Sequence, residues 1–326
     1  MHQRSRTLAA ALSALAATTV LTLPAAHAAP PREAAPYDLN GDGFPEVVVG
    51  VANGTVDGRQ QAGHVAVVPG SATGPATAQR RTVSQASTGV PGAPEPFDQF
   101  GAHHTSADLD RDGYADLAVG GARSVGPDDP DWEPRYPVAS GVGGTVRVLY
   151  GGPKGPAGGG EPVDFSQETP GVPGTGAGES ERGDAFGFAV SAADTDADGH
   201  ADLAIGAPGE AAGTKAGAGR VTLLYGSPTG LRADRSYGVH QDAPGVPGGS
   251  EAQDAFGAKV VLRDTDGDRR ADPHTAATGE DGGDGRVWSL SRAADDGAVT
   301  GVGYSAASLH LPAPIRGLEF GRGLGN

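Results

Sequence analysis

The chain has 326 residues, a formal net charge of −16 at pH 7 and no cysteine. Its acidity disfavours a nucleic-acid partner, which binds a basic surface, and the lack of cysteine excludes disulfides, thiol catalysis and cysteine metal sites. With 55 glycines and 26 prolines, the composition is close to that of disordered chains. Strand-like runs recur between the glycines, however, so we expect a folded protein.

The start of the chain has the features of an export signal. Two arginines precede an apolar run over residues 8–23, and Ala26-His27-Ala28 has the small-x-small pattern of a cleavage site. Pro24 ends the run, which is shorter than the roughly 20 residues that a membrane span needs. We therefore predict a signal peptide over 1–28, a disordered segment over 29–36, and a secreted, extracellular protein whose mature chain has no membrane span.

An acidic loop of nine residues occurs four times in the chain. In the complete copies, aspartates occupy positions 1, 3, 5 and 9 and glycine occupies position 6, as in Asp194-x-Asp196-x-Asp198-Gly199-x-x-Asp202. The backbone carbonyl of position 7 can supply one more oxygen. The predicted metal-ligating residues are Asp38, Asn40, Asp42, Phe44 and Glu46; Asp108, Asp110, Asp112, Tyr114 and Asp116; Asp194, Asp196, Asp198, His200 and Asp202; and Asp264, Asp266, Asp268, Arg270 and Asp272.

This spacing directs several oxygens at one point, and cations of the size of Ca²⁺ prefer six to eight oxygens in a flexible cage. Neighbouring carboxylates repel one another, so a cation is needed among them. We therefore predict Ca²⁺ as the bound cofactor. The side chains at the ligand positions include 15 acids, which account for most of the net charge.

The nearest alternative to this interpretation is an EF-hand, which needs a bidentate Glu at position 12 and flanking helices. In the first three copies, short β-rich runs that end at glycine follow position 9, as in Leu203-Ala-Ile-Gly206. These loops therefore connect strands. Position 12 of the four copies is occupied by Val49, Val119, Ile205 and Thr275.

The loops recur at near-regular intervals. They begin 70, 86 and 70 residues apart, and Phe-Gly stands eight residues before the loop at Phe100, Phe186 and Phe256. Each interval contains a further strand-like run, such as that from Gly219 to Tyr225. Regular spacing indicates stacked supersecondary units. Four short antiparallel strands per unit are typical of a β-propeller blade, so we predict an all-β propeller fold.

The Phe-Gly start, the Asp-x-Asp-x-Asp-Gly loop and the Ile-Gly-Ala-Pro ending at 205–208 resemble the FG-GAP repeats of integrin α-subunit N-terminal propellers and their bacterial relatives. The resemblance covers nearly all of residues 37–326. It implies a propeller with blades at about 37–99, 100–185, 186–255 and 256–319, and a partial strand at 320–326.

Two units depart from this pattern. The first lacks a Phe-Gly strand, because no Phe-Gly occurs before its loop in residues 29–36. The fourth has a run that starts with Pro273 in place of Leu-Ala-Ile-Gly-Ala-Pro, and proline is poorly tolerated inside a strand. In addition, Arg269 replaces the glycine of position 6, which costs about 1 kcal/mol if that position requires a positive φ. We expect the fourth metal site to be the weakest.

The sequence leaves the number of blades open. The resemblance implies about seven blades, whereas the chain holds roughly four and begins another at Phe320-Gly321. One interpretation is an open arrangement of a truncated product. The other is a closed four-bladed ring in which residues 320–326 supply the first strand of the unit that starts at Asp38.

The longest insertion in a repeat runs from Ser124 to Gly143 and contains Trp132 and Tyr136. In an up-and-down blade it lies on the face opposite the acidic loops. It is either a surface loop without a binding role or a contact site for a partner. The second interpretation is reasonable because variable loops on a rigid scaffold often contain binding residues.

Three smaller features have a structural explanation beside a functional one. Arg182-Gly183-Asp184 spells an integrin-ligand tripeptide, but Asp-x-Phe-Gly is part of the repeat. His103 and His104 align with strand residues of other units rather than with a catalytic or zinc site. Ser305 lacks the second glycine of a nucleophile elbow.

The leading hypothesis is a secreted, calcium-binding, integrin-like propeller that acts as an extracellular binding or cell-adhesion module. Its calcium is structural, and its partner is an unidentified extracellular protein or glycan. We expect no catalytic residues, and hence no enzyme. The alternatives are a secreted hydrolase or lyase on a propeller scaffold, which needs a cluster with perturbed ionisation in the central channel, and a degenerate structural repeat protein.

Overall fold

The computed structural model of the protein describes residues 32–124, 141–174, 183–292, 298–312 and 317–325. The chain divides into two compact units, Met1–Pro30 and Pro31–Asn326, and every described residue belongs to the second. The predicted signal peptide, Trp132, Tyr136 and Arg182 lie outside the described residues. Within the described part, no helix has the length and apolar character required to cross a membrane.

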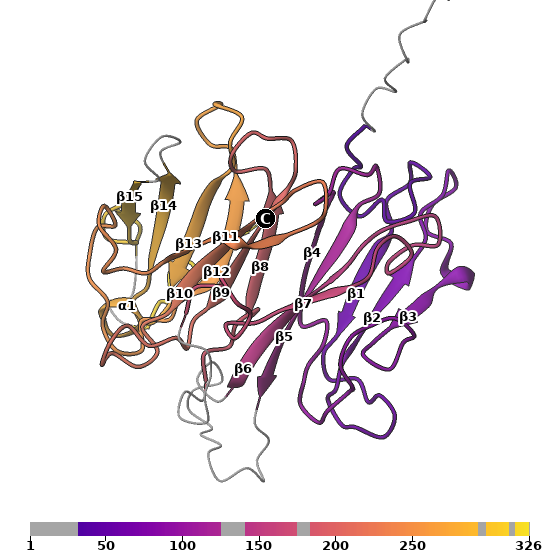
Figure 1. Ribbon diagram of the computed structural model, residues 1–326. Coiled ribbons are helices and arrows are strands. Elements are labelled where there is room, and N and C mark those ends of the chain that lie inside the picture. The colour runs from indigo at the N-terminus through magenta and orange to yellow at the C-terminus, as the bar shows by residue number, and fades with distance from the viewer. Residues whose placement is uncertain (1–31, 125–140, 175–182, 293–297, 313–316, 326) are drawn as a thin grey trace, which may run out of the picture. The chain divides into compact units, whose positions relative to one another are not determined.

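The fold is all-β, as predicted, and consists of four antiparallel sheets that follow one another along the chain (Figure 1). The first sheet has three strands and the others have four, and consecutive strands are neighbours throughout, as in propeller blades. The strands are β1 (Val47–Val51), β2 (His64–Val68) and β3 (Arg81–Val83); β4 (His103–Ala107), β5 (Asp116–Ser124), β6 (Gly141–Leu149) and β7 (Val163–Phe165); β8 (Ala189–Ala193), β9 (Asp202–Ala207), β10 (Arg220–Tyr225) and β11 (Arg232–Val239); and β12 (Phe256–Arg263), β13 (Asp272–Ala277), β14 (Arg286–Arg292) and β15 (Val299–Tyr304). The described helices are single turns, η1 (Thr77–Gln79) and α1 (Glu280–Gly283).

The hydrophobic core is divided among the junctions between consecutive sheets. One cluster joins the first and second sheets, another the second and third, and another the third and fourth. The phenylalanine of each Phe-Gly pair that precedes an acidic loop is buried in one of these clusters: Phe100 is 1% exposed, and Phe186 and Phe256 are 0% exposed. Consecutive units are therefore held together by the same apolar side chain that recurs in the sequence.

Two of these Phe-Gly pairs are also hydrogen-bonded to the unit before them. The amides of Phe100 and Phe256 donate to the carbonyls of Ala62 and Ala218, both at 3.0 Å. The residue after this carbonyl is a glycine, because a Cβ there would overlap backbone atoms of the phenylalanine. This close approach explains why a glycine opens the third strand-like run of every unit, at Gly63, Gly144, Gly219 and Gly285.

Among the residues that the structure describes, the first sheet lacks the inner strand that the other sheets have, in agreement with the absence of Phe-Gly in this part of the sequence. Residues 32–36, which the sequence predicts to be disordered, have a place in the structure: Ala34 is buried, and its amide donates to Asp108 Oδ2 at 3.0 Å. This segment therefore contacts the second unit and does not pair with β1. As a result, Val47 and Val49 are 45% and 48% exposed.

The last Phe-Gly pair contacts the fourth sheet. The amide of Phe320 donates to the carbonyl of Asp284 at 3.0 Å, as the amides of Phe100 and Phe256 do to their preceding units. Leu324 lies beside the inner strands β4, β8 and β12, and Figure 1 places the C-terminal label in the same region. Described residues 320–325 contribute no strand to the sheet of β1, so the interpretation in which they close a four-bladed ring is not what the structure shows.

Pro273 lies within β13, although the sequence analysis expects proline to disfavour a strand there. It pairs with Leu262 of β12, whereas the described pairing of β13 with β14 begins at His274. Proline is therefore placed near the strand start, where its missing N–H removes no bond to β14.

Packing of the Phe-Gly pair leads to a stability prediction. We expect Phe186→Ala to lower the free energy of unfolding by about 3–5 kcal/mol, because it leaves a cavity between the second and third sheets. Phe44→Ala is the matched control, since Phe44 is 41% exposed, and should have little effect. Urea unfolding measures both, and equal losses for the two variants would contradict this role of the buried phenylalanine.

Candidate metal centres

The acidic loops lie between the first and second strands of each full sheet and bring their carboxylates together. In three of them, one ligand oxygen from each of three aspartates lies within 4.8 Å of the others. The groups are Asp108, Asp110 and Asp116; Asp194, Asp196 and Asp202; and Asp264, Asp266 and Asp268. Each group combines positions 1 and 3 with position 5 or 9, so the spacing in sequence does produce a shared centre.

Short-range hydrogen bonds give the loops one common conformation. The position 1 carboxylate accepts a bond from the position 6 amide, as between Asp194 and Gly199 at 2.9 Å. The position 5 carboxylate accepts a bond from the position 7 amide, as between Asp198 and His200 at 2.8 Å. Asparagine and aspartate commonly form such turns with a backbone amide two residues on. The same bonds occur in the loops that start at Asp38, Asp108 and Asp264.

The first loop has the same two hydrogen bonds, with an amide at position 3 and a glutamate at position 9. Glu46 accepts bonds from the Leu39 amide at 2.7 Å and from Asn40 Nδ2 at 2.6 Å. Asp38 Oδ1 is buried and has no hydrogen-bond partner among the described residues. A buried carboxylate oxygen without a partner is costly, and a bound cation would satisfy it. The residues of this loop therefore fit a metal ion.

Burial and mutual repulsion raise the pKa of several loop carboxyls. Burial, followed by the neighbouring Asp112, raises the pKa of Asp110 to about 6. Burial is also the main cause that raises the pKa of Asp116 to about 8 and that of Asp202 to about 7. Without a cation, these groups are costly to ionise near neutral pH. A divalent ion would supply the positive charge that favours their ionised form.

The carboxylate at position 9 connects the second and third loops to the end of the third strand of their sheets. Asp116 accepts bonds from the Leu109 amide at 2.9 Å and from the Gly151 amide at 2.8 Å. Asp202 accepts equivalent bonds from Thr195 at 2.8 Å and Gly226 at 2.9 Å. This residue therefore holds the loop in place in addition to contributing an oxygen.

Neighbouring loops are joined through their backbones. The carbonyl of position 1 accepts a hydrogen bond from the position 8 amide of the next unit: Ala115 to Asp38 at 2.9 Å, Ala201 to Asp108 at 3.2 Å and Ala271 to Asp194 at 2.8 Å. Repulsion within one loop therefore acts at a junction between two units.

The fourth loop is the most open. Asp264, Asp266 and Asp268 are all exposed, whereas Asp108 and Asp116 are buried. Arg269 has a φ of 73°, so position 6 takes a left-handed conformation even where glycine is missing. The expectation that the fourth site is the weakest stays a prediction. Ligation by the position 7 carbonyls also stays a prediction, for Phe44, Tyr114, His200 and Arg270.

Position 4 of the loop is a feature that the sequence analysis missed. It also has a positive φ in all four copies, at Gly41 (69°), Arg111 (58°), Ala197 (62°) and Gly267 (86°). Glycine in two of the four copies was the available signal. The guanidinium group of Arg111 lies against Gly199 of the next loop, so this side chain fills the space between the second and third loops.

The other residues considered from the sequence have structural roles. His103 lies in β4 with its ring centroid 4.9 Å from that of Phe188, and burial lowers its pKa to about 4. Asp184 is buried, and its carbonyl accepts the Gly209 amide at 3.1 Å. Ser305 Oγ accepts the Ser308 amide at 3.3 Å within a turn. Each contact is explained by the repeat or by a local turn.

Comparison with known proteins identifies the family to which the repeat belongs. The profile of the FG-GAP repeat matches residues 31–68 and 186–224, which contain the first and third acidic loops. The chain contains FG-GAP repeats. The intervening and following units share the loop pattern and strand order of the matched segments.

Curated relatives align with part of the chain. They include phosphatidylinositol-glycan-specific phospholipase D from Mus musculus, 31% identical over 180 residues, and from Rattus norvegicus, 30% identical over 194 residues. These alignments cover 54% and 59% of this chain but 18% and 20% of the relatives. The chain thus spans about a fifth of their length, and the similarity concerns that part of them.

The φ of Arg269 leads to a second stability prediction. Replacing a left-handed arginine by glycine relieves a strained backbone, so we expect Arg269→Gly to raise the free energy of unfolding by about 0.5–1 kcal/mol. The neighbouring substitution Arg270→Gly should lower it, because it only adds freedom to the unfolded chain. Denaturant titration compares the two. If both variants lose the same stability, position 6 does not need a positive φ.

Proposed function

We propose that this protein is a secreted, calcium-binding module of the FG-GAP, integrin-like type, in which Ca²⁺ stabilises the fold and the surface binds an extracellular partner. The observation that carries the proposal is the convergence of three aspartate oxygens within 4.8 Å in each of three loops. Oxygen-only donor sets of this kind suit hard cations such as Ca²⁺. The features of an export signal support secretion.

The expected contribution of calcium to stability is large for a chain without disulfides. An ion that binds only the folded state adds RT ln(1 + [Ca²⁺]/Kd) per site. At a concentration about ten times Kd this is about 1.4 kcal/mol per site, or roughly 5–6 kcal/mol for four sites. A domain is stable by about 5–15 kcal/mol in total. Calcium would therefore supply a considerable part of the stability of the fold.

A role in binding or adhesion rests on the resemblance to integrin propellers and on the scaffold itself. Rigid sheets that carry loops at their ends are common platforms for recognition. We propose an extracellular protein or glycan as the partner, and no catalytic role for the chain.

An enzyme is the second candidate, because the curated relatives are named as phospholipases. The described cavity beside the inner strands has a volume of about 290 Å³ and is lined by His103, His104 and Lys259 together with aliphatic residues. Those lining residues include no carboxylate and no hydroxyl group, so an enzyme that used this cavity would need histidine or lysine as its nucleophile.

Incubating the purified chain with glycans, phospholipids and glycosylphosphatidylinositol-anchored proteins separates these candidates. As a binding module, the protein should retain a partner on an immobilised array and release no product that mass spectrometry detects. Calcium-dependent turnover that is lost in His103→Ala and His104→Ala variants would reject the binding module in favour of the enzyme.

Calcium stoichiometry tests the metal assignment. Neutralising two ligands of one loop, in Asp196→Asn with Asp198→Asn, should lower the number of calcium ions bound by one and leave the other sites filled. Isothermal titration calorimetry measures this number directly.

The matched control removes two acids outside the loops, in Asp57→Asn with Glu161→Gln. Both residues are exposed, and asparagine tolerates the φ of 48° at position 57. The control should bind as many ions as the unchanged protein. An unchanged stoichiometry in the loop variant would show that the ions bind elsewhere.

A further inference from the structure

A cavity of about 320 Å³ lies between the third and fourth sheets, next to their acidic loops. Its aliphatic lining comes from both sheets, and its volume is at the lower end of the range for small-molecule sites. The aliphatic residues include Val221, Leu223 and Val239 from the third sheet and Leu290 and Val299 from the fourth.

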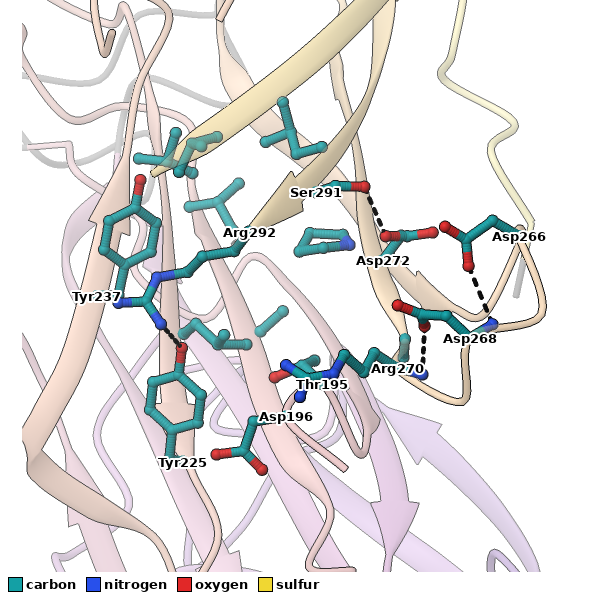
Figure 2. A pocket seen from close by; sticks show the side chains of 18 of the residues that line it. Thr195, Asp196, Tyr225, Tyr237, Asp266, Asp268, Arg270, Asp272, Ser291 and Arg292 are labelled. Atoms are coloured by element: carbon teal, nitrogen blue, oxygen red, sulfur yellow. Dashed lines mark hydrogen bonds between the residues drawn. The ribbon is translucent and has the colours of Figure 1, made fainter. Parts of the chain in front are cut away.

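Cationic and aromatic side chains surround this apolar lining. Figure 2 shows Arg292 reaching between Tyr225 and Tyr237. Its Nη1 donates to the Tyr225 hydroxyl at 2.9 Å, and its guanidinium carbon lies 5.0 Å from the centroid of the Tyr237 ring. Arg235 also lies near the Tyr225 ring, with its guanidinium carbon 5.5 Å from the ring centroid. Two guanidinium groups are thus held in place by aromatic rings.

A third guanidinium group, from Arg270, lines the opposite side of the cavity, near Thr195 and Asp196 (Figure 2). Among the described residues, Arg235, Arg270 and Arg292 form no ion pair within 4.0 Å, whereas Arg220 and Arg286 pair with glutamates. The cavity therefore gathers three cations whose charge is not neutralised by a direct carboxylate contact.

The net charge around the cavity depends on whether the adjacent acidic loops hold cations. Its lining contains three arginines and four loop carboxylates, Asp196, Asp266, Asp268 and Asp272, which gives a net charge of −1. The two loops carry eight aspartates in all, so one divalent cation in each loop would change the combined charge of these aspartates and the three arginines from −5 to −1. Metal binding would therefore weaken the electrostatic repulsion of an anion by the surroundings of the cavity.

The corresponding junction between the second and third sheets is filled differently. There the Tyr150 hydroxyl accepts the Leu231 amide at 3.2 Å, and Leu231 is packed in the core cluster. Arg111, at position 4 of the second loop, covers the next loop, whereas position 4 of the third loop is Ala197. The junction of the third and fourth sheets, which contains the cavity, thus has the small Ala197 at position 4, where the preceding junction has Arg111.

From this combination we propose that the cavity binds an amphiphilic anion, in which an acidic head group is attached to an apolar body, and that it does so when the adjacent loops hold calcium. The aliphatic side chains contact the apolar body, and the guanidinium groups of Arg235, Arg270 and Arg292 bind the head group. The calcium dependence rests on the proposed function.

Binding of octanoate to the full chain, measured by calorimetry with excess calcium and again with a chelator, tests this inference. Octyl phosphate, titrated in parallel, distinguishes a carboxylate from a phosphate head group, and neutral octyl glucoside tests the need for charge. In excess calcium, we expect at least one of the two anions to bind. Octyl glucoside in calcium, and the anions in chelator, should bind at least about tenfold more weakly.

Arg235→Gln and Arg292→Gln should each weaken binding of the anion about tenfold, because each removes a charge-assisted contact. Arg59→Gln is the control, since Arg59 is exposed in the first unit and outside the cavity, and it should leave binding unchanged. Thermal melting of the variants checks that each is folded; Arg235 is exposed and its replacement should not affect folding.

The outcomes separate this inference from the proposed function. If calcium binds but neither anion does, or if the anions bind equally well to the Arg235→Gln variant, the inference is wrong and the calcium assignment stands. If calcium itself does not bind, the proposed function fails, and any binding of the anions that then persists overturns the calcium dependence proposed for the cavity.

Discussion

Repulsion between carboxylates that the fold brings together is the constraint on which this structure depends. Hydrogen bonds to backbone amides fix the loop carboxylates around common points, and burial raises the pKa of Asp116 to about 8. Because Asp38, Asp108 and Asp194 each accept an amide of the next unit, the repulsion lies at the junctions of the sheets. A cation in each loop would therefore stabilise the loop and the junction together.

The Phe-Gly pairs provide the apolar counterpart of this arrangement. Phe100, Phe186 and Phe256 are buried between two sheets, and the amides of Phe100 and Phe256 donate to the preceding unit. At the point of closest approach, a Cβ would overlap the backbone of the phenylalanine, so the residue there is a glycine. The junctions are thus built from one apolar contact and one polar loop contact, repeated along the chain. Stability in such repeats depends mainly on the interfaces between neighbours. Loss of either contact should therefore affect more than one unit.

The repeated features could be predicted from the sequence because they are local: the period of the loops, the strand runs between glycines and the positive φ at position 6. Features that depend on contacts between units could not. The course of residues 32–36 follows from the bond of Ala34 to Asp108, and the cavity beside Tyr225 follows from the packing of two sheets. Pro273 is tolerated because of where β14 begins to pair with β13, which the sequence alone does not reveal.

Differential scanning calorimetry of the chain in excess calcium and in excess chelator measures the central claim most directly. If cations neutralise the four loops, removing them should lower the melting temperature by about 10 °C or more, given roughly 5–6 kcal/mol for four sites. An identical melting temperature in the two conditions would contradict the account, because the carboxylates would then be tolerated together without a metal ion.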